Sequence, residues 1–231
     1  MIELMNDILT IIPARGGSKS IPRKNLQVIN GKSLVERSVI NALKIPNNNI
    51  VVSTDDKEIY QHIKKFPIKV LKRSEFNSTD TASSESVVLE VLDELRTFEG
   101  VIVLLQATCP FLDINALNSA IDLLLRSNSI DSMFSAVLKN EFIWELGKHW
   151  EPKNHDKSSR TPRQLRPPTA VETGSFYIFK SKKFMKEKTR FCGLSYPAFT
   201  KVWSSFDIDT QEDLDFCREL STILDFPPYL V

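Results

Sequence analysis

The amino-acid sequence predicts an α/β fold in which helices cover both faces of a mostly parallel mixed sheet. Short runs of β-branched and other apolar residues do not alternate with polar ones, which is typical of strands buried on both faces. Between these runs, apolar residues recur at three- and four-residue spacing, which is typical of helices with one buried face. The two patterns alternate along the chain, so the sequence predicts strand, helix, strand units.

The predicted elements follow one another in a regular order. Five runs are predicted strands, at residues 8–14, 50–53, 68–71, 101–106 and 132–137. The helices between them have apolar faces formed by Val35, Val39, Ile40 and Leu43, by Val87, Val88, Val91, Leu92 and Leu95, and by Leu117, Ile121, Leu124 and Leu125. A further strand is predicted at residues 175–179, and a last helix starts near Thr210.

The segment 139–168 interrupts this order. It holds Trp144 and Trp150 among prolines and charged residues, and it shows no helical period. A free loop with two Trp residues and clustered prolines is unexpected, so we expect the segment to pack against a second copy of the chain. The sequence therefore predicts one domain over residues 1–231, with 139–168 as an inserted dimerisation excursion and a homodimer as the assembly.

Length, charge and cysteine content restrict the class of protein. A chain of 231 residues suits one ample domain. Thirty basic and 29 acidic side chains give a net charge of +1, which argues against nucleic acid or an acidic membrane as the main partner. Three widely spaced cysteines without a C-x-x-C pair indicate neither a disulfide framework nor a zinc site. The cysteine pattern predicts a reducing, cytoplasmic setting. No apolar run approaches the roughly 20 residues that span a bilayer, so we expect a soluble protein.

A basic segment follows the first predicted strand. Residues 13–25 contain Arg15, Lys19, Arg23 and Lys24 and no acid. They lie at the carboxyl end of the strand, where open α/β sheets bind their ligands, and residues 16–18 (Gly-Gly-Ser) can bring backbone N–H groups close to an anion. The segment is predicted to hold phosphate, although it matches neither the Walker nor the dinucleotide pattern. The alternative is a solvated basic loop.

An acidic segment near the end of the chain complements the basic one. Asp207 and Asp209 lie two apart in a stretch without basic residues. In an extended segment such residues point the same way, so both carboxylates can meet one hard cation such as Mg²⁺. A basic loop with a carboxylate pair indicates a metal-bound polyphosphate. The alternative is that Asp209 or Thr210 caps the last helix.

Polar residues also follow the other predicted strands. Residues 53–56 (Ser-Thr-Asp-Asp) follow the second strand, Arg73 the third, and Gln106 with Thr108 the fourth. The carboxyl ends of parallel strands meet at one edge of the sheet, so we expect these residues on a single rim. The alternatives are helix capping by Asp55 and a surface ion pair for Arg73.

These motifs together resemble a known family. Residues 12–19 (Ile-Pro-Ala-Arg-Gly-Gly-Ser-Lys) and 21–25 (Ile-Pro-Arg-Lys-Asn) are similar to the signature of the acylneuraminate cytidylyltransferases, the CMP-sialic acid synthetases. Residues 53–56, 80–84, 104–110, 163–164 and 206–210 resemble further blocks of that family, in order and over nearly the whole chain.

The resemblance implies a nucleotide-diphosphosugar-transferase-like fold and an activity. CMP would pass from CTP to the anomeric hydroxyl of a nine-carbon 2-keto-3-deoxy sugar acid, with release of pyrophosphate and with Mg²⁺ as cofactor. The implied nucleotide-binding residues are Ala14, Arg15, Gly16, Ser18, Lys19, Lys24, Asn25, Arg73, Ala82 and Ser84. The implied sugar-binding residues are Gln106, Thr108, Arg163, Thr173 and Tyr177, with Arg163 reaching across a dimer interface. The implied catalytic residues are Arg15, Lys19, Gln106, Asp207 and Asp209, of which Asp207 and Asp209 would hold the metal.

The sequence departs from the family pattern on the sugar side. Ala107 and Cys109 stand where the family reads L-Q-P-T-S-P, and Thr173 stands where Asn commonly precedes Gly. A Lys that is common in the family near residues 140–144 is absent here, and Phe142 and Trp144 stand in that stretch. The acceptor is therefore expected among sialic, legionaminic, pseudaminic and deaminated nine-carbon acids.

Two other functions remain open at this point. A metal-dependent glycosyltransferase of similar topology would carry its D-x-D in mid-chain rather than near the end. A non-catalytic nucleotide-binding module would be favoured by loss of Lys19 or Asp209, and both are present. No general base is evident, because His62, His149 and His155 lie outside the motif blocks.

Overall fold

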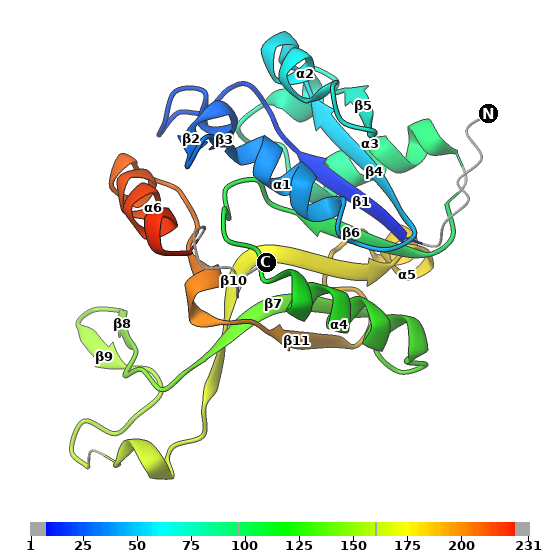
Figure 1. Cartoon of the computed structure of the whole chain (residues 1–231). Helices are drawn as coiled ribbons and strands as arrows, with labels where there is room; N and C mark the ends of the chain where they lie inside the picture. Colours follow the sequence, from blue (N-terminus) through cyan, green and yellow to red (C-terminus); the bar gives the residue numbers. More distant parts are fainter. Residues whose placement is uncertain (1–7, 97, 160, 225–231) are drawn as a thin grey trace.

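A seven-stranded sheet forms the centre of the molecule, in the order β11-β7-β10-β6-β1-β4-β5 (Figure 1). The computed structural model describes residues 8–96, 98–159 and 161–224. The strands are β1 (Ile8–Pro13), β4 (Asn48–Thr54), β5 (Lys69–Lys72), β6 (Val101–Leu105), β7 (Ser132–Lys139), β10 (Thr169–Lys180) and β11 (Ser195–Phe199). Strands β6, β1, β4 and β5 are parallel to one another, β10 runs antiparallel to β6 and β7, and β11 is parallel to β7. The mostly parallel mixed sheet is confirmed.

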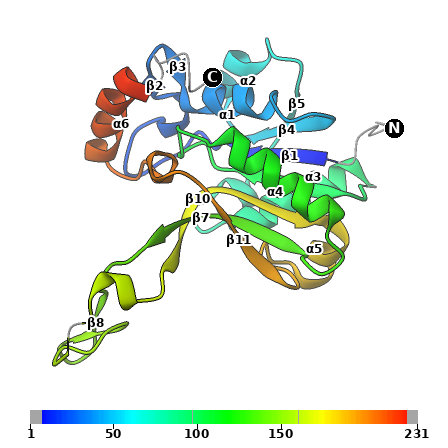
Figure 2. The ribbon, with the colours of Figure 1, turned by 60° about the horizontal axis from the view of Figure 1, so that its bottom comes forward.

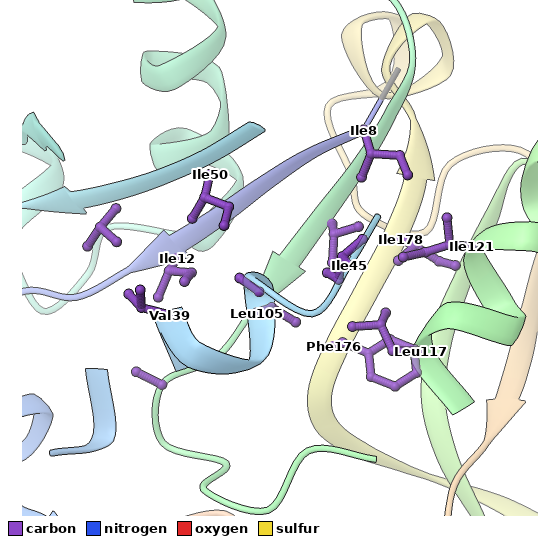
Figure 3. Close-up of a cluster of buried hydrophobic side chains, with 14 of the residues drawn as sticks. Ile8, Ile12, Val39, Ile45, Ile50, Leu105, Leu117, Ile121, Phe176 and Ile178 are labelled. Atoms are coloured by element: carbon purple, nitrogen blue, oxygen red, sulfur yellow. The ribbon is translucent and has the colours of Figure 1, made fainter. Parts of the chain in front are cut away.

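Helices cover both faces of this sheet, as the sequence predicts. One face packs against α1 (Leu34–Ala42), α2 (Lys57–Ile63) and α4 (Ile114–Arg126), and Figure 3 shows Val39, Leu117 and Ile121 in this cluster. The other face packs against α3 (Ser84–Leu95) and α5 (Ser181–Glu187). Alternate residues of β1 divide between the two cores, because successive strand side chains point to opposite faces.

A third cluster attaches the last helix. Helix α6 (Gln211–Leu224) packs Leu214 and Cys217 against Ile29, Leu34 and Phe111. Nearby lie the short β2 (Val28–Ile29) and β3 (Lys32–Ser33) and the 3-10 turns η1 (Lys24–Leu26) and η4 (Val202–Ser205). The helix begins one residue after Thr210, as predicted. Just before this helix, Asp209 Oδ1 lies 3.1 Å from Lys24 Nζ, so the acidic segment meets the basic segment that follows β1.

Some details of the helix and strand predictions are wrong. Leu43 and Leu125 were predicted on buried faces, but they are 42% and 49% exposed. Leu43 lies beyond the end of α1, and Leu125 falls outside the stripe that Leu117, Ile121 and Leu124 form at helical spacing. The sequence did not predict α2, α5 or β11, because these short elements bury few apolar residues: only Ala198 of β11 is fully covered.

The predicted excursion is a projecting arm, which we define as residues 139–168. It leaves the sheet from β7 and returns through β10, and it stands away from the body in both views (Figure 2). It contains the antiparallel pair β8 (Trp144–Leu146) and β9 (Trp150–Pro152) and the turn η3 (Arg163–Leu165). That the arm forms a dimer interface stays a prediction. In the part of the chain that the structure describes, no helix is both long enough and apolar enough to cross a membrane.

Candidate active site

A cavity of about 490 Å³ opens at the carboxyl ends of β1, β4, β5 and β6. This is the edge at which open parallel sheets bind ligands. Eleven predicted site residues line it: Arg15, Ser18, Lys19, Lys24, Asn25, Arg73, Ala82, Ser84, Gln106, Thr108 and Asp209. The structure thus brings most of the predicted nucleotide site together, from five separate stretches of sequence.

The glycine loop is fixed by the end of β4. The backbone N–H of Gly16 donates to Asp55 Oδ1 at 2.9 Å. A Cβ at Gly16 would lie 2.5 Å from Asp56 Oδ2, so only glycine fits without movement of that carboxylate. Asp56 caps α2 by accepting from the backbone N–H of Glu58 and of Ile59. The capping alternative for Asp55 is therefore wrong: its neighbour caps the helix, and Asp55 holds the loop.

Positive charge dominates the cavity wall. Arg15 Nη1 and Lys19 Nζ each lie 2.8 Å from the carboxylate of Asp80. The hydrogen bond from Lys19, and then the nearby positive charges, lower the pKa of Asp80 below its ordinary value. The lining residues Arg15, Lys19, Lys24 and Arg73 outnumber the lining acids Asp80 and Asp209. Such a wall suits a ligand with several negative charges.

Arg73 belongs to the cavity floor and not to the surface. It is only 5% exposed, and its Nε and Nη2 donate to Ser53 Oγ and Ser53 O at 3.1 and 2.8 Å. Burial lowers the pKa of Arg73 to about 10, against the opposing charges of Asp55 and Glu90. The guanidinium is still charged at neutral pH. The surface ion-pair alternative for Arg73 is wrong, because the side chain is fixed beneath the cavity.

The last helix is capped without Asp209. Thr210 Oγ1 accepts from the backbone N–H of Asp213 at 3.2 Å, and Asp213 Oδ2 accepts from the N–H of Thr210 at 2.7 Å. This reciprocal pair is a capping box. Of the two capping candidates, Thr210 is therefore the right one. The side chain of Asp209 lines the cavity, where Lys24 Nζ lies 3.1 Å from its Oδ1 and 2.7 Å from Ile208 O.

Asp207 faces the interior, beside Gln106. The N–H of Ile208 donates to Thr108 O, which joins this segment to the end of β6. Gly174 has φ +72°, and a Cβ there would lie 3.7 Å from Asp207 Oδ2 and 4.0 Å from Gln106 Oε1. Asp207 Oδ1 is buried and has no hydrogen-bond partner among the described residues. A buried carboxylate oxygen without a donor is unfavourable, so it suits a cation ligand.

Cys109 lies beside this pair. Its thiol is buried, and burial, followed by the charge of Asp207, raises its pKa well above the ordinary value. A thiol that stays protonated is a poor nucleophile. The residue packs at the end of β6, with its sulfur 3.8 Å from Thr173 O.

The predicted sugar-binding residues are not all brought to the cavity. Gln106 and Thr108 line it, but Thr173 is buried and donates to Ser135 Oγ at 2.8 Å. Tyr177 packs in the core between the sheet and helices α3 and α5, and its hydroxyl donates to Glu172 Oε1. The Tyr177 ring also lies under the guanidinium of Arg190, at 4.5 Å. The Arg163 backbone lies in η3 of the arm, and its side chain is outside the described residues.

Several cavity residues were missed by the sequence analysis. The resemblance includes Asp80 in a motif but assigns it no role, although four cations in a segment without acids indicate that an acidic partner lies elsewhere in the sequence. Asn77 and Thr79 line the same wall and were not noted. They belong to the irregular stretch around η2 (Phe76–Ser78), where no periodic pattern indicates which side chains point inward.

Comparisons with known proteins agree with this geometry. A family model described as cytidylyltransferase matches residues 9–223. N-acylneuraminate cytidylyltransferase A of Danio rerio is 34% identical over 216 residues, which cover 90% of this chain and 49% of that protein. Pseudaminic acid cytidylyltransferase of Campylobacter jejuni is 31% identical over 229 residues, covering 92% of this chain and 95% of that one. The chain thus spans about half the length of the fish relative and nearly all of the bacterial one.

A second bacterial relative and one solved structure are also similar to this chain. CMP-N,N'-diacetyllegionaminic acid synthase of Legionella pneumophila is 29% identical, covering 92% of this chain and 95% of that one. The solved structure of a CMP:2-keto-3-deoxy-manno-octonic acid synthetase complexed with CTP superposes with a TM-score of 0.67 at 16% identity, covering 94% of this chain and 99% of that chain. At this identity the structural likeness concerns the fold, which is that of nucleotidyltransferases, as the sequence implied.

Proposed function

Because this chain belongs to the cytidylyltransferase family, we propose that it transfers CMP from CTP to the anomeric hydroxyl of a nine-carbon 2-keto-3-deoxy sugar acid. The observation that carries the proposal is the cavity, where four cations and Asp209 lie at the carboxyl ends of parallel strands. Asp207 lies buried next to it, beside Gln106. The names of the relatives, which concern N-acylneuraminate, pseudaminic and legionaminic acids, support an acceptor of this class. A glycosyltransferase is not supported, because its D-x-D would lie in mid-chain.

The reaction asks little covalent chemistry of the protein. The anomeric oxygen forms a bond to the α-phosphorus of CTP, the bond from that phosphorus to the bridging oxygen breaks, and pyrophosphate leaves. The hydroxyl proton is released during the attack. Arg15 and Lys19 hold the β- and γ-phosphates and neutralise charge that grows on pyrophosphate. Gln106 orients the hydroxyl, since an amide can donate and accept hydrogen bonds but is not a base.

A divalent cation fits the acidic side of the cavity. Asp207, beside Gln106, has a buried oxygen without a donor among the described residues, and Asp209, two residues further on, lines the cavity. Among the described residues no group of three or more His, Cys, Asp or Glu side chains is arranged to hold a metal. Mg²⁺ commonly binds through one or two carboxylates with substrate phosphates and water, so the pair is sufficient. Bound there, Mg²⁺ would supply Lewis-acid polarisation of the α-phosphate.

We also propose a homodimer formed through the arm. Trp144, Leu146, Trp150 and Leu165 are exposed there in a single chain, which is costly for a soluble protein unless a partner covers them. Arg163 would then reach the neighbouring site and meet the acidic acceptor. The three cysteines are buried and free, which supports a reducing, cytoplasmic setting.

The direct test is pyrophosphate release with CTP and Mg²⁺ over a panel of nine-carbon and eight-carbon 2-keto acids. We expect turnover with at least one nine-carbon acid and much slower turnover with the eight-carbon acids. CTP should react at least about tenfold faster than UTP, because a polar base site rejects the wrong donor pattern. Equal rates with the two nucleotides would contradict the cytidylyltransferase assignment, and no turnover on the whole panel would contradict the acceptor class.

A further inference from the structure

Asn77 carries a free hydrogen-bond acceptor at the wall of the cavity. The residue lines the cavity from η2 and is only 6% exposed. Its Nδ2 donates to Glu90 Oε2 at 2.9 Å and to Ser86 O at 3.4 Å. Its Oδ1 is buried and has no hydrogen-bond partner among the described residues. An unpaired buried carbonyl is unfavourable, so its retention beside a ligand cavity points to a ligand donor.

The orientation of this amide is determined by its neighbours. Burial alone would raise the pKa of Glu90, but the hydrogen bonds from Ser74 and Asn77 hold this pKa below its ordinary value. An ionised carboxylate only accepts hydrogen bonds, so the donor end of the Asn77 amide must face Glu90. The same Glu90 accepts from the backbone N–H of Ser74 at 2.8 Å, which fixes the carboxylate in turn. The acceptor end of Asn77 is therefore the end left for another group.

The opposite donors come from Arg73, four residues earlier. Two of its N–H groups are used on Ser53, and the guanidinium has further donors. Arg73 and Asn77 both line the cavity, together with Ala82 and with Val87 of α3. One wall thus offers strong donors from a guanidinium and one acceptor from an amide.

This combination matches cytosine and not uracil. Cytosine presents an exocyclic amine as donor beside two acceptors, whereas uracil presents a carbonyl where cytosine has the amine. An amide oxygen attracts the amine and repels that carbonyl. We infer that Asn77 is the specificity-determining residue for the base, with its Oδ1 accepting from the 4-amino group of CTP. This inference rests on the proposed function, because it assigns the nucleotide of the same cavity.

The oxygen is covered by neighbouring atoms, so the base reaches it after a small shift of the wall. That wall segment continues into Asp80, whose carboxylate lies on Arg15 and Lys19. A triphosphate that displaces this carboxylate from Arg15 and Lys19 would remove two contacts that hold the segment. A purely structural role for Asn77 would not depend on the 4-amino group, and this separates the two readings.

The experiment is a calorimetric binding cycle with two ligands and two proteins, in the absence of sugar acid. The ligands are CTP and the pyrimidin-2-one ribonucleoside triphosphate, which lacks only the 4-amino group. The proteins are the natural chain and Asn77→Leu, with Asn77→Ala as a second variant should the leucine not fold. We expect the natural chain to bind CTP about tenfold tighter than the analogue, the size of one lost hydrogen bond. Asn77→Leu should bind both with the same Kd.

A matched control is Ser78→Ala, on the same turn. Ser78 Oγ donates to Ser74 O and the residue does not line the cavity, so the tenfold preference should remain. The inference is overturned if Asn77→Leu weakens both ligands by one factor, or if the natural chain does not distinguish them. Because no acceptor is present, a failure of every sugar acid in the pyrophosphate assay would overturn the proposed reaction and leave this result standing.

Discussion

The cavity and the arm differ in whether their side chains have partners within the chain. In the cavity, charged groups are paired within the chain: Asp80 lies on Arg15 and Lys19, and Asp209 lies on Lys24. In the arm, large apolar side chains stay open to solvent, with Trp150 63% and Leu165 74% exposed. A charged ligand can exchange with an internal ion pair at modest cost, but exposed apolar surface is covered only by another apolar surface. The first arrangement suits a small anion and the second a protein partner.

The largest effect should come from the acidic side of the cavity. Asp207→Asn or Asp209→Asn keeps the shape of the side chain and removes a charged oxygen ligand. If the pair holds Mg²⁺, turnover should fall by about two to three orders of magnitude, because transition-state charge stabilisation by a metal is worth several kcal/mol. Turnover measured against Mg²⁺ concentration, with the melting temperature of each variant, checks this.

The control is Asp213→Asn, in the first turn of α6, the helix that follows Asp207 and Asp209. It removes a carboxylate that accepts from the N–H groups of Asp209 and Thr210, so it should lower the melting temperature. Its turnover should stay within about threefold of the natural protein, since it lies outside the cavity lining. Normal turnover in both the Asp207 and the Asp209 variant would contradict a metal site on this pair.

The next effect tests the arm. Leu165→Asp together with Trp150→Asp places charge on the exposed apolar surface and should convert a dimer to a monomer in sedimentation equilibrium. If Arg163 completes the neighbouring site, turnover per chain should fall at least about tenfold at the same time. Tyr60→Asp, on an exposed position of α2 at the other end of the molecule, is the control and should change neither quantity. A natural chain that sediments as an active monomer would contradict the proposal.

The sequence predicted the body of the fold well, for a physical reason. A strand buried on both faces must be apolar throughout, so runs such as residues 8–14 and 101–106 are visible without any tertiary information. Short elements such as α2 bury only Ile59 and Ile63 and leave no such pattern. The arm was visible only as a loss of periodicity, because its pairing is local and its side chains have no core to face.

The site was predictable where it depends on topology. Arg73 and Gln106 follow parallel strands, so they meet at one edge whatever the loops do. Asn77 and Asp80 lie on an irregular turn, and nothing in the sequence specifies the backbone path that brings them inward. Tyr177 was placed on the sugar side by resemblance, yet consecutive aromatic residues in a strand do not reveal which of them faces which layer.

The body of the molecule, unlike the arm, contains a nearly buried carboxylate with several partners, Glu36, and its contribution to stability should depend on pH. Glu36 accepts from the N–H of Ser33 at 3.0 Å and pairs with Lys65 Nζ and His62 Nε2 at 2.6 and 2.9 Å. Burial alone would raise the pKa of Glu36, but these partners lower it from 4.5 to about 2. A carboxylate with a lowered folded-state pKa contributes stability above its unfolded value and loses it as the pH falls. Its contribution should therefore be complete above about pH 5 and disappear between pH 4.5 and about 2.

Urea unfolding of Glu36→Gln tests this. At pH 7 the variant should be less stable by about 1–3 kcal/mol, since it loses charged hydrogen bonds in the first turn of α1. The difference from the natural protein should shrink as the pH falls through that window. A difference that does not change with pH would show that packing, and not the charge of Glu36, stabilises this part of the body.

The smallest effect concerns Asp80. It tests whether ligand phosphates replace the Asp80 carboxylate as the partner of Arg15 and Lys19. Asp80→Asn keeps the size of the side chain and removes the charge that lies on Arg15 and Lys19. A polyphosphate then meets two cations without a competing carboxylate. Inorganic tripolyphosphate, measured by calorimetry, should bind about three- to fivefold tighter at low salt. The gain should shrink at 0.5 M salt, because exposed charges are screened over a few ångströms there.

The control for this measurement is Glu58→Gln, which also removes one negative charge. Glu58 pairs with Arg23 at 2.7 Å outside the cavity lining, so its loss changes the net charge but not the local competition. It should leave tripolyphosphate binding unchanged, which would assign the gain in Asp80→Asn to the two cations and not to the overall charge. Weaker binding in Asp80→Asn would mean that the carboxylate holds Arg15 and Lys19 in position for phosphate, and the exchange of internal for ligand charge would then be wrong for this cavity.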